Sequence, residues 1–521
     1  MTKPRRRNVL LFLADQWRGD TLERVGHPLI RTPAIDALGR DAVTFRNCFT
    51  NATPCGPART SMLTGQYMMN HRVVWNGTPL DRRHSNLALE MRRLGYEPAM
   101  FGYTSSTPDP RDHAPDDPAM REPHGNMVGF VDIAPGLPTA RPYMSHVQKL
   151  GYPVPAEPND FWLPDESEAR AAAAAGKGPT WAPARFTSEH SDNAFLIDET
   201  MRYIAAKGDR PWFVHVATMR PHPPFIAPRP YHDLYRAEDV PPPRRAASRD
   251  AEAQQHPLLA RLLATTTQLD YFRTGKGLAA DLDEKALRQL RATYYGMMVE
   301  LDHHFGRLMK FLKDTGQYED TLIIFSSDHG EMLGNHHMLG KSGYFDDAFH
   351  IPLIVRAPEA AAARGAVVDE FVETIDMMPT IMEWLGAEVP VQCQGASLLG
   401  FCRGTPPAAW RDAVFFEFDY RFIAGDDVAL PRRLDQMCLA AVRDRRGKYV
   451  HFPGLKPLFF DLSDDPHEFV DRAGDPACAG RLSDYRARLL DWRMACADQT
   501  FTNTQATPGG LVVKRDPLRW A

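Results

Sequence analysis

Short apolar runs that end at polar or charged residues recur along the chain, and each is typical of a buried β-strand. The run NVLLFLAD at 8–15 is apolar at almost every position, as in a central parallel strand that is covered on both faces. The run DTLIIFSSDHG at 320–330 has the same character and stops at charged residues and a glycine. We predict further strands at 97–104, 211–218 and 350–358.

Helices are predicted between these strands. A helix begins near 57–63, where Pro57 suits the first helical position. Residues 284–316 carry a long amphipathic pattern, and 372–387 predicts another helix, interrupted by Pro379. Alternating strands and helices predict an α/β fold, an α/β/α sandwich around a large, mostly parallel central sheet.

The pattern changes near residue 405. Runs at 413–419, 437–452 and 458–468 predict antiparallel strands joined by tight turns. We therefore expect a large domain over 1–404 and a smaller C-terminal α+β domain over 405–500.

Three other segments stand apart from these two predicted domains. The alanine-rich stretch at 166–186 is interpreted as an inserted surface loop or weak helix, and the proline-rich, charged stretch at 228–257 as a mobile insertion. The polar tail at 501–521 is expected to dock on a neighbouring part of the protein or on a partner subunit.

Composition narrows the classes of partner and compartment. The 521 residues carry a formal net charge of −5, so neither nucleic acid nor an acidic membrane is expected as the main partner. The seven cysteines are odd in number and form no CxxC pair, which favours a reducing compartment. Three arginines before VLLFLA imitate a signal peptide, but six apolar residues are too few for one, and no other apolar run could span a bilayer. We expect a cytoplasmic protein.

Two aspartates follow predicted strands at distant points of the sequence. Asp15 ends the first apolar run and Asp328 follows the run at 320–330. Each alone could be a helix cap or a turn residue. Because ligands gather at the carboxyl ends of parallel strands, the pair predicts one shared site.

Cys55 lies in an unusual setting. A free cysteine is most often a small buried hydrophobic residue. Here Pro54, Gly56 and Pro57 make a stiff segment, and the following helix would aim its positive end at residue 55, which suits an anion. Arg59 lies four positions after the cysteine, whereas thiolate phosphatase loops place their arginine six positions after it.

The motif Cys-x-Pro-x-Arg at 55–59, followed by TSMLTGQY, resembles the sulfatase branch of the alkaline phosphatase superfamily. The segments NVLLFLADQ, RPHPPF, FSSDHGEMLG and KPLFFDLSDDPHE are also similar and occur in the family's order. The resemblance implies an alkaline-phosphatase-like fold in which 1–404 is the catalytic domain. It also implies that a formylglycine-generating enzyme oxidises Cys55 to formylglycine, whose hydrate attacks phosphorus or sulfur and later releases itself by re-forming the aldehyde.

The resemblance further implies a set of site residues. One divalent metal ion would be held by Asp15, Gln16, Asp328, His329 and residue 55. Calcium, manganese and zinc stay open, because oxygen ligands suit the first and the histidine makes the other two plausible. The remaining catalytic residues would be Arg59, which supports the nucleophile, His222, which shuttles a proton, and Lys341, which reaches the non-bridging oxygens.

Neutral side chains replace cations at the predicted substrate site. Where many arylsulfatases carry a lysine and a histidine, this chain has Tyr103, Thr104 and Ser105, with Asn76 upstream. Together with DQWR and GYFDDAFHIPLIVR, this pattern resembles bacterial phosphonate monoester hydrolases and their arylsulfatase relatives. We therefore expect small phosphonate, phosphate or sulfate esters as substrates and, by the same resemblance, a homo-oligomer, dimer or tetramer, in which 228–257 or the tail crosses between subunits.

Two alternatives stay open on the sequence alone. One is an arylsulfatase with sulfate monoesters as its main substrates. The other, from a different class, is a non-catalytic metal-binding protein in which Cys55 is unmodified.

Overall fold

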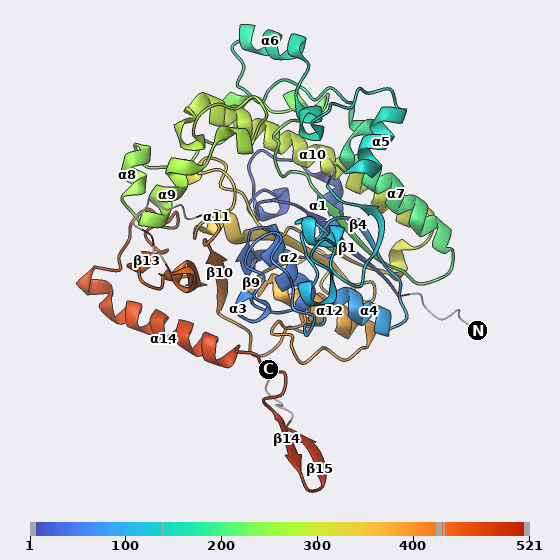
Figure 1. Ribbon diagram of the computed structural model, residues 1–521, viewed down its shortest axis with the longest axis vertical. Coiled ribbons are helices and arrows are strands. Elements are labelled where there is room, and N and C mark those ends of the chain that lie inside the picture. Colours follow the sequence, from blue (N-terminus) through green and yellow to red (C-terminus); the bar gives the residue numbers. More distant parts are fainter. Residues whose placement is uncertain (1–6, 138–139, 424–429, 431–432, 515–521) are drawn as a thin grey trace.

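An eight-stranded sheet runs through the middle of the molecule (Figure 1). The computed structural model describes residues 7–137, 140–423, 430 and 433–514, so the extreme end of the predicted tail, 515–521, and small parts of the two predicted domains lie outside the described residues. In spatial order the strands are β5 (Val131–Pro135), β4 (Pro98–Gly102), β6 (Phe213–Thr218), β1 (Asn8–Ala14), β7 (Thr321–Ser326), β8 (His350–Arg356), β2 (Val43–Phe49) and β9 (Val367–Glu373).

Every pair of neighbouring strands in this sheet is parallel except the two pairs that β8 makes, with β7 and with β2. The expectation of a large, mostly parallel sheet is therefore confirmed. All five predicted strands lie in it. β1 is central, paired with β6 on one side and β7 on the other.

Helices cover both faces of the sheet, because alternate residues of a buried strand point to opposite sides. Leu10 and Phe12 of β1 face a cluster that includes α1 (Pro33–Arg40), α7 (Asp192–Lys207) and α10 (Glu284–Asp314). On the other side, Val9 and Leu11 of β1 pack in a cluster with side chains of α2 (Cys55–Thr64), α4 (Leu87–Arg93), α12 (Met377–Leu385) and α13 (Leu399–Cys402). The arrangement is the predicted α/β/α sandwich.

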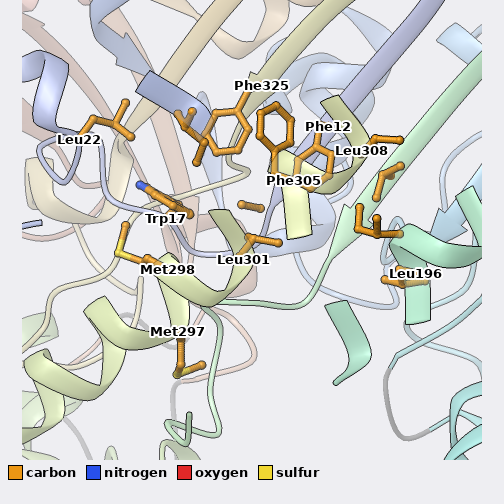
Figure 2. Close-up of a cluster of buried hydrophobic side chains, with 14 of the residues drawn as sticks. Phe12, Trp17, Leu22, Leu196, Met297, Met298, Leu301, Phe305, Leu308 and Phe325 are labelled. Atoms are coloured by element: carbon orange, nitrogen blue, oxygen red, sulfur yellow. The ribbon is translucent and has the colours of Figure 1, made fainter. Parts of the chain in front are cut away.

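Figure 2 shows how tightly the sheet and the long helix α10 pack. The ring of Phe12 meets that of Phe305 edge-on with centroids 5.0 Å apart and stacks near Phe325 at 5.8 Å. Trp17 continues the cluster just beyond the site-forming end of β1. Burial of these large side chains anchors the strand end from which Asp15 projects.

The helix predicted at 372–387 is wrong in its first part. Residues up to Glu373 belong to β9, because they pair with β2, and a short 3-10 turn follows before α12 starts at Met377. Pro379 does not interrupt α12. It is the third helical residue, where the backbone N–H has no intrahelical partner in any case, so its absence costs nothing.

The stretches at 166–186 and 228–257 both contain short helical elements, and an exposed helix in the first agrees with the surface loop or weak helix expected there. Residues 166–174 form the exposed helix α6 (Glu166–Ala174), which lies at the edge of the molecule in Figure 1. The stretch at 228–257 contains two 3-10 turns and the helix α8 (Arg249–Ala253). Arg291 of α10 donates hydrogen bonds to the carbonyl oxygens of Pro241 and Pro242, at 2.9 and 3.2 Å, so this stretch is held against α10.

A second, five-stranded sheet forms the C-terminal part. Its order is β13 (Leu458–Asp461), β12 (Gly447–His451), β11 (Cys438–Asp444), β10 (Ala413–Asp419) and β3 (Ala52–Thr53). β10 to β13 pair antiparallel, as predicted, and the helix α14 (Ala479–Ala495) packs on them. β3, however, comes from the N-terminal part of the chain and pairs parallel with β10, two residues before Cys55. The small sheet therefore contributes directly to the surroundings of that cysteine.

Other elements complete the described structure. The remaining α-helices are α3 (Met68–His71), α5 (Arg141–Lys149), α9 (Pro257–Thr265) and α11 (Asp346–Phe349). The hairpin of β14 (Thr504–Thr507) and β15 (Gly510–Val513) projects from the body of the molecule (Figure 1). Within the described residues, none of the helices combines the length and the apolar character needed to cross a bilayer.

A buried carboxyl group makes the stability of this fold depend on pH. Asp302 of α10 accepts hydrogen bonds from the backbone N–H groups of Ala34 and Ile35, at 3.1 and 2.7 Å, at the start of α1. Burial raises the pKa of Asp302 to about 7. The folded protein therefore holds a proton that the unfolded chain releases near pH 4, and folding stability falls as the pH rises from about 4 to 7, by at most about 1.4 kcal/mol per pH unit.

Asp302→Asn should remove this pH dependence. The melting temperature of the variant, relative to wild type, is expected to rise between pH 5 and pH 7 and to level off above pH 7, where the wild-type carboxylate is ionised. Thermal unfolding followed at several pH values measures the difference. The exposed Asp314→Asn serves as the control and should show a constant difference. An Asp302→Asn difference that is equally constant would contradict the assignment.

Candidate active site

Two neighbouring strands bring the first polar residues of the site together. β1 ends at Ala14 and is followed by Asp15, while β7 is followed within three residues by Asp328 and His329. Since β1 and β7 are adjacent and parallel, their carboxyl ends meet. The His329 Nε2 atom lies 3.7 Å from a carboxylate oxygen of each aspartate, and all three side chains are fully buried. The prediction of one shared site is confirmed in its geometry.

Cys55 reaches the same point from the other direction. It is the first residue of α2, so Pro57 is the third helical residue and not the first, as the sequence predicted. The Sγ atom lies 3.1 Å from His329 Nε2 and 3.9 Å from Asp15 Oδ1. Ligand-type atoms of Asp15, Cys55, Asp328 and His329 all lie within 4.8 Å of one another.

Arg59, one helical turn further along α2, lies between the two carboxylates. Its guanidinium contacts Asp15 Oδ2 at 2.7 Å and Asp328 Oδ2 at 2.8 Å, and all three side chains have no exposed surface. Although burial alone would favour the protonated acid, interactions with His329, which is charged only in acid, and with the permanently charged Arg59 hold the pKa of Asp328 below its usual range. The arginine therefore pairs with both buried carboxylates and favours the ionised form of Asp328.

The donors in this cluster fit a divalent metal ion. Burial lowers the pKa of His329 to about 4, so the imidazole is neutral at physiological pH and its Nε2 lone pair is available. Two buried carboxylates share a single guanidinium, which leaves negative charge for a cation to balance. Carboxylate oxygens together with one imidazole are ligands that calcium, manganese and zinc each accept in proteins.

Gln16 lies beside this cluster and forms hydrogen bonds through both its backbone and its side chain. Its backbone N–H donates to Asp328 Oδ1 at 3.1 Å, and its side-chain oxygen accepts a hydrogen bond of 2.6 Å from Lys341 Nζ. The side-chain NH₂ donates to Glu331. The structure thus brings the predicted Lys341 next to the predicted metal ligands through Gln16.

Glu331 was missed in the sequence. It has no exposed surface and also accepts the backbone N–H groups of Leu333 and Gly340, at 3.0 and 2.7 Å. Its contact with the NH₂ group of Gln16 fixes which end of that amide faces Lys341. The only signal was its position two residues after His329 in the segment DHGE, where an acidic residue is easily taken for a turn residue.

His222 and Lys341 are the two other titratable residues that the sequence predicted for the site, and each interacts with charged residues of the cluster. Burial, together with the nearby charge of Lys341, lowers the pKa of His222 well below its usual value. The His222 Nδ1 atom lies 2.8 Å from the carbonyl oxygen of Pro223, so Nδ1 carries the proton and Nε2 is an acceptor. Burial disfavours the Lys341 ammonium, but Cys55 and Asp15 outweigh it and raise the pKa of the lysine.

A buried arginine holds the loop that carries His222. Arg220 donates to the carbonyl oxygens of His222 and Pro224, at 3.2 and 3.0 Å. The same guanidinium contacts Asp192 at 3.4 Å and stacks over the ring of Trp162 at 4.1 Å. The predicted proton-shuttle residue is therefore positioned by Arg220, the first residue of the motif RPHPPF, which Asp192 and Trp162 hold from outside the motif.

The four neutral residues predicted to bind substrate separate into two pairs. Asn76 Oδ1 accepts the backbone N–H of Gly56 at 2.7 Å, and the Tyr103 hydroxyl donates to Asp15, so these two lie at the site. The Thr104 hydroxyl instead accepts the backbone N–H of Met127 at 2.7 Å. The Ser105 hydroxyl lies 3.2 Å from Nδ1 of His124, a histidine that the sequence analysis did not select.

The chain that carries this site matches known protein families along most of its length. A family model described as Sulfatase matches residues 7–387, and one described as N-sulphoglucosamine sulphohydrolase, C-terminal, matches 334–494. The multifunctional alkaline phosphatase superfamily protein PehA of Trinickia caryophylli is 44% identical over 98% of this chain and 99% of its own length. An arylsulfatase of Clostridium perfringens is 24% identical over 95% of this chain and 96% of its own length.

Solved structures agree with these matches. The phosphonate monoester hydrolase of Agrobacterium radiobacter superposes with a TM-score of 0.92 at 40% identity, covering 98% of this chain and 100% of the other. The phosphonate monoester hydrolase of Silicibacter pomeroyi gives a TM-score of 0.89 at 37% identity, covering 98% and 99%.

Proposed function

Because this chain belongs to the sulfatase family of hydrolases, we propose that it is a metal-dependent, formylglycine-using hydrolase of phosphonate monoesters and phosphodiesters that also accepts aryl sulfate monoesters. The observation that carries the proposal is the meeting of Cys55, at the start of α2, with Asp15, Asp328 and His329 at the ends of two adjacent strands. A formylglycine and a metal ion are typical of the family.

The surroundings of Cys55 disfavour a thiolate as the nucleophile. Burial and the carboxylates of Asp15 and Asp328 raise the pKa of the Cys55 thiol well above its usual value, even though Lys341 and Arg59 oppose them. An uncharged hydroxyl that loses its proton only during attack suits this environment better. The hydrate of a formylglycine aldehyde provides two such hydroxyls on one carbon.

The chemistry then balances with water as the only co-reactant, because water adds to the aldehyde and re-forms the hydrate after each turnover. One hydroxyl of the hydrate attacks phosphorus or sulfur, and the bond to the leaving alcohol breaks as that alcohol takes up a proton. The second hydroxyl gives up its proton, its electron pair forms the aldehyde C=O, and the C–O bond to the transferred group breaks. His222, whose Nε2 is an unprotonated acceptor, is the proposed proton acceptor in this second step.

The remaining residues bind and orient. Lys341 supplies a fixed positive charge for the non-bridging oxygens, and Asn76 holds the backbone of Gly56 behind the nucleophile. Arg59 pairs with both carboxylates and holds them in place. A divalent ion held by Asp15, Asp328, His329, residue 55 and the side-chain oxygen of Gln16 would supply Lewis-acid activation and balance their charge. Its identity, calcium, manganese or zinc, is accessible to elemental analysis.

The balance of charge favours singly charged tetrahedral groups. Lys341 is accompanied around the nucleophile by the neutral side chains of Asn76 and Tyr103. Phosphonate monoesters, phosphodiesters and sulfate monoesters all carry one negative charge, whereas phosphate monoesters carry up to two. The phosphonate monoester hydrolases among the similar structures support phosphonate esters as the main class.

The proposal is tested by comparing substrates and by mass spectrometry. Protein made together with a formylglycine-generating enzyme should show an aldehyde in place of the thiol in the peptide that spans 51–59. Its kcat/KM should be higher for p-nitrophenyl phenylphosphonate and bis-p-nitrophenyl phosphate than for p-nitrophenyl sulfate. A preference for the sulfate would favour the arylsulfatase alternative, which the similarity to the Clostridium perfringens arylsulfatase keeps open. An intact thiol in an active preparation would refute the mechanism.

We also propose a homo-oligomer. The hairpin of β14 and β15 exposes Leu511, Val512 and Val513 by 75%, 51% and 60%, and it stands away from the body of the chain (Figure 1). An isolated two-stranded hairpin is only marginally stable in water. A second copy of the chain that covers these side chains would account for both features, and the described part of the predicted tail, 501–514, would then cross between subunits.

A further inference from the structure

A segment outside all the recognised motifs forms part of the active-site wall. Residues 122–127, EPHGNM, lie against the segment 103–107 that follows β4. Ser106 N–H donates to the Gly125 carbonyl at 3.0 Å, and Met127 N–H donates to the Thr104 hydroxyl at 2.7 Å. The Asn126 side chain donates to the carbonyl oxygen of Gly102 at 3.3 Å. The two segments are therefore joined along their length.

The same segment also touches the loop that carries Asn76. Pro123 packs on Gly77 so closely that a Cβ atom on this glycine would lie 3.1 Å from Pro123 Cβ. The carbonyl oxygen of Ser105, in turn, lies 3.0 Å from the position of a Cβ on Gly56, the residue after the nucleophile. His124, which follows Pro123, is thus held between the two segments assigned to substrate binding.

His124 has one ring nitrogen engaged and one open. The Nδ1 atom lies 3.2 Å from Ser105 Oγ, and its ring meets that of Tyr103 edge-on with centroids 6.2 Å apart. Ser105 is fully buried, its backbone φ of 53° is rare for a residue with a side chain, and His124 Nδ1 is the acceptor that its hydroxyl finds among the described residues. For Nε2 no partner is found in the part of the chain that the structure describes.

These contacts determine which ring nitrogen of His124 carries the proton. A buried hydroxyl has to donate its hydrogen, so the Ser105 O–H points at Nδ1 and the proton of the neutral ring is on Nε2. Burial is the main cause that lowers the pKa of His124, with Arg59 and Lys341 acting in the same direction and Glu122 and Asp15 against it. At neutral pH the ring therefore presents an uncharged N–H donor at Nε2.

We propose that His124 is a specificity-determining residue that donates a hydrogen bond from Nε2 to the singly charged phosphonate, phosphodiester or sulfate group of the substrate. This proposal rests on the proposed function. It gives a physical role to a neutral histidine at this wall, because a neutral donor stabilises one negative charge without favouring a second. Ser105 is then a positioning residue, which orients the ring through Nδ1.

Three substitutions at position 124 separate recognition from mere support of the loop. His124→Gln keeps a neutral N–H donor, His124→Leu removes it, and His124→Lys supplies a fixed positive charge. The substrates are p-nitrophenyl phenylphosphonate and p-nitrophenyl sulfate, which are singly charged, and p-nitrophenyl phosphate, which is doubly charged above pH 7. The matched control is His113→Gln. His113 is a half-buried histidine in the same connection between β4 and β5, and it pairs with Asp117.

For His124→Leu, kcat/KM for the two singly charged substrates should fall by about 10- to 100-fold, the loss expected for one hydrogen bond to a charged group. His124→Gln should stay within about fivefold of wild type. His124→Lys should raise the ratio of kcat/KM for the phosphate monoester to that for the phosphonate by about tenfold or more. His113→Gln should resemble wild type on all three substrates.

If kcat/KM fell equally on all three substrates in His124→Gln, His124→Leu and His124→Lys, the proposal would be overturned. Equal losses are the result that a purely structural role of His124 predicts. Ratios that stay at the wild-type values in all three variants would overturn it as well. Failure of the wild-type enzyme to turn over any of the esters would count against the proposed function instead. In that case binding of intact p-nitrophenyl phenylphosphonate, which carries one negative charge, still decides the role of His124 when measured by calorimetry, since His124→Leu should weaken it by about tenfold or more.

Discussion

Cys55→Ala should lower kcat/KM for p-nitrophenyl phenylphosphonate by at least about four orders of magnitude, the scale seen when a nucleophile is removed and only binding remains. The substitution deletes the attacking group and leaves the helix start intact, because alanine is tolerated at the first turn of α2. Initial-rate kinetics over a range of substrate concentrations measure the loss. Cys438→Ala, at a partly buried cysteine of β11, is the control and should retain activity.

Cys55→Ser refines this test. A serine hydroxyl can attack once, but it has no second hydroxyl on the same carbon with which to expel the transferred group. We therefore expect a single slow turnover that leaves a phosphonyl group on residue 55, detectable as a mass increase of the intact protein. Repeated turnover by Cys55→Ser would show that release of the transferred group does not need the second hydroxyl, and full activity of Cys55→Ala would show that residue 55 is not the nucleophile.

Asp328→Asn should abolish tight metal binding and reduce kcat/KM by at least about three orders of magnitude. Asp328 Oδ1 accepts the backbone N–H groups of Gln16 and His329, at 3.1 and 3.0 Å, and Oδ2 receives Arg59 Nε at 2.8 Å. The side-chain oxygen of asparagine can still accept the two backbone N–H groups. Its NH₂ group, however, then faces the Arg59 guanidinium, and the site loses one of its negative charges. The variant is also expected to unfold at a lower temperature, because Arg59 loses a buried partner.

Metal content per chain, determined by elemental analysis after dialysis, is the measurement that checks this prediction. Asp302→Asn is the matched control, since it neutralises another buried carboxylate away from the cluster and should keep its metal. If Asp328→Asn retained a full equivalent of metal and normal kcat/KM, the assignment of the cluster as the metal site would be wrong.

Apolar run length and local motifs were sufficient to predict the strands and to single out Cys55. The sequence could show that β1 and β7 are buried strands, because a continuous apolar run stopped by polar residues is a local property. It could also show that Asp15 and Asp328 follow those strands and that Cys55 and Arg59 share a motif. Adjacent parallel strands necessarily bring such residues to one edge, so the centre of the site followed from the sequence.

The sequence alone therefore determined the α/β class, the aspartates at the strand ends and the presence of a helix next to Cys55. Only the tertiary structure decided that Glu331 faces Gln16. It decided as well that the hydroxyls of Thr104 and Ser105 form hydrogen bonds with residues of the 122–127 segment. It also decided that β3 joins the C-terminal sheet and that His124 reaches the site. The physical reason is range: strand burial is encoded by neighbouring residues, whereas the direction of a side chain in a loop depends on partners distant in the sequence, which come close only after the whole chain has packed.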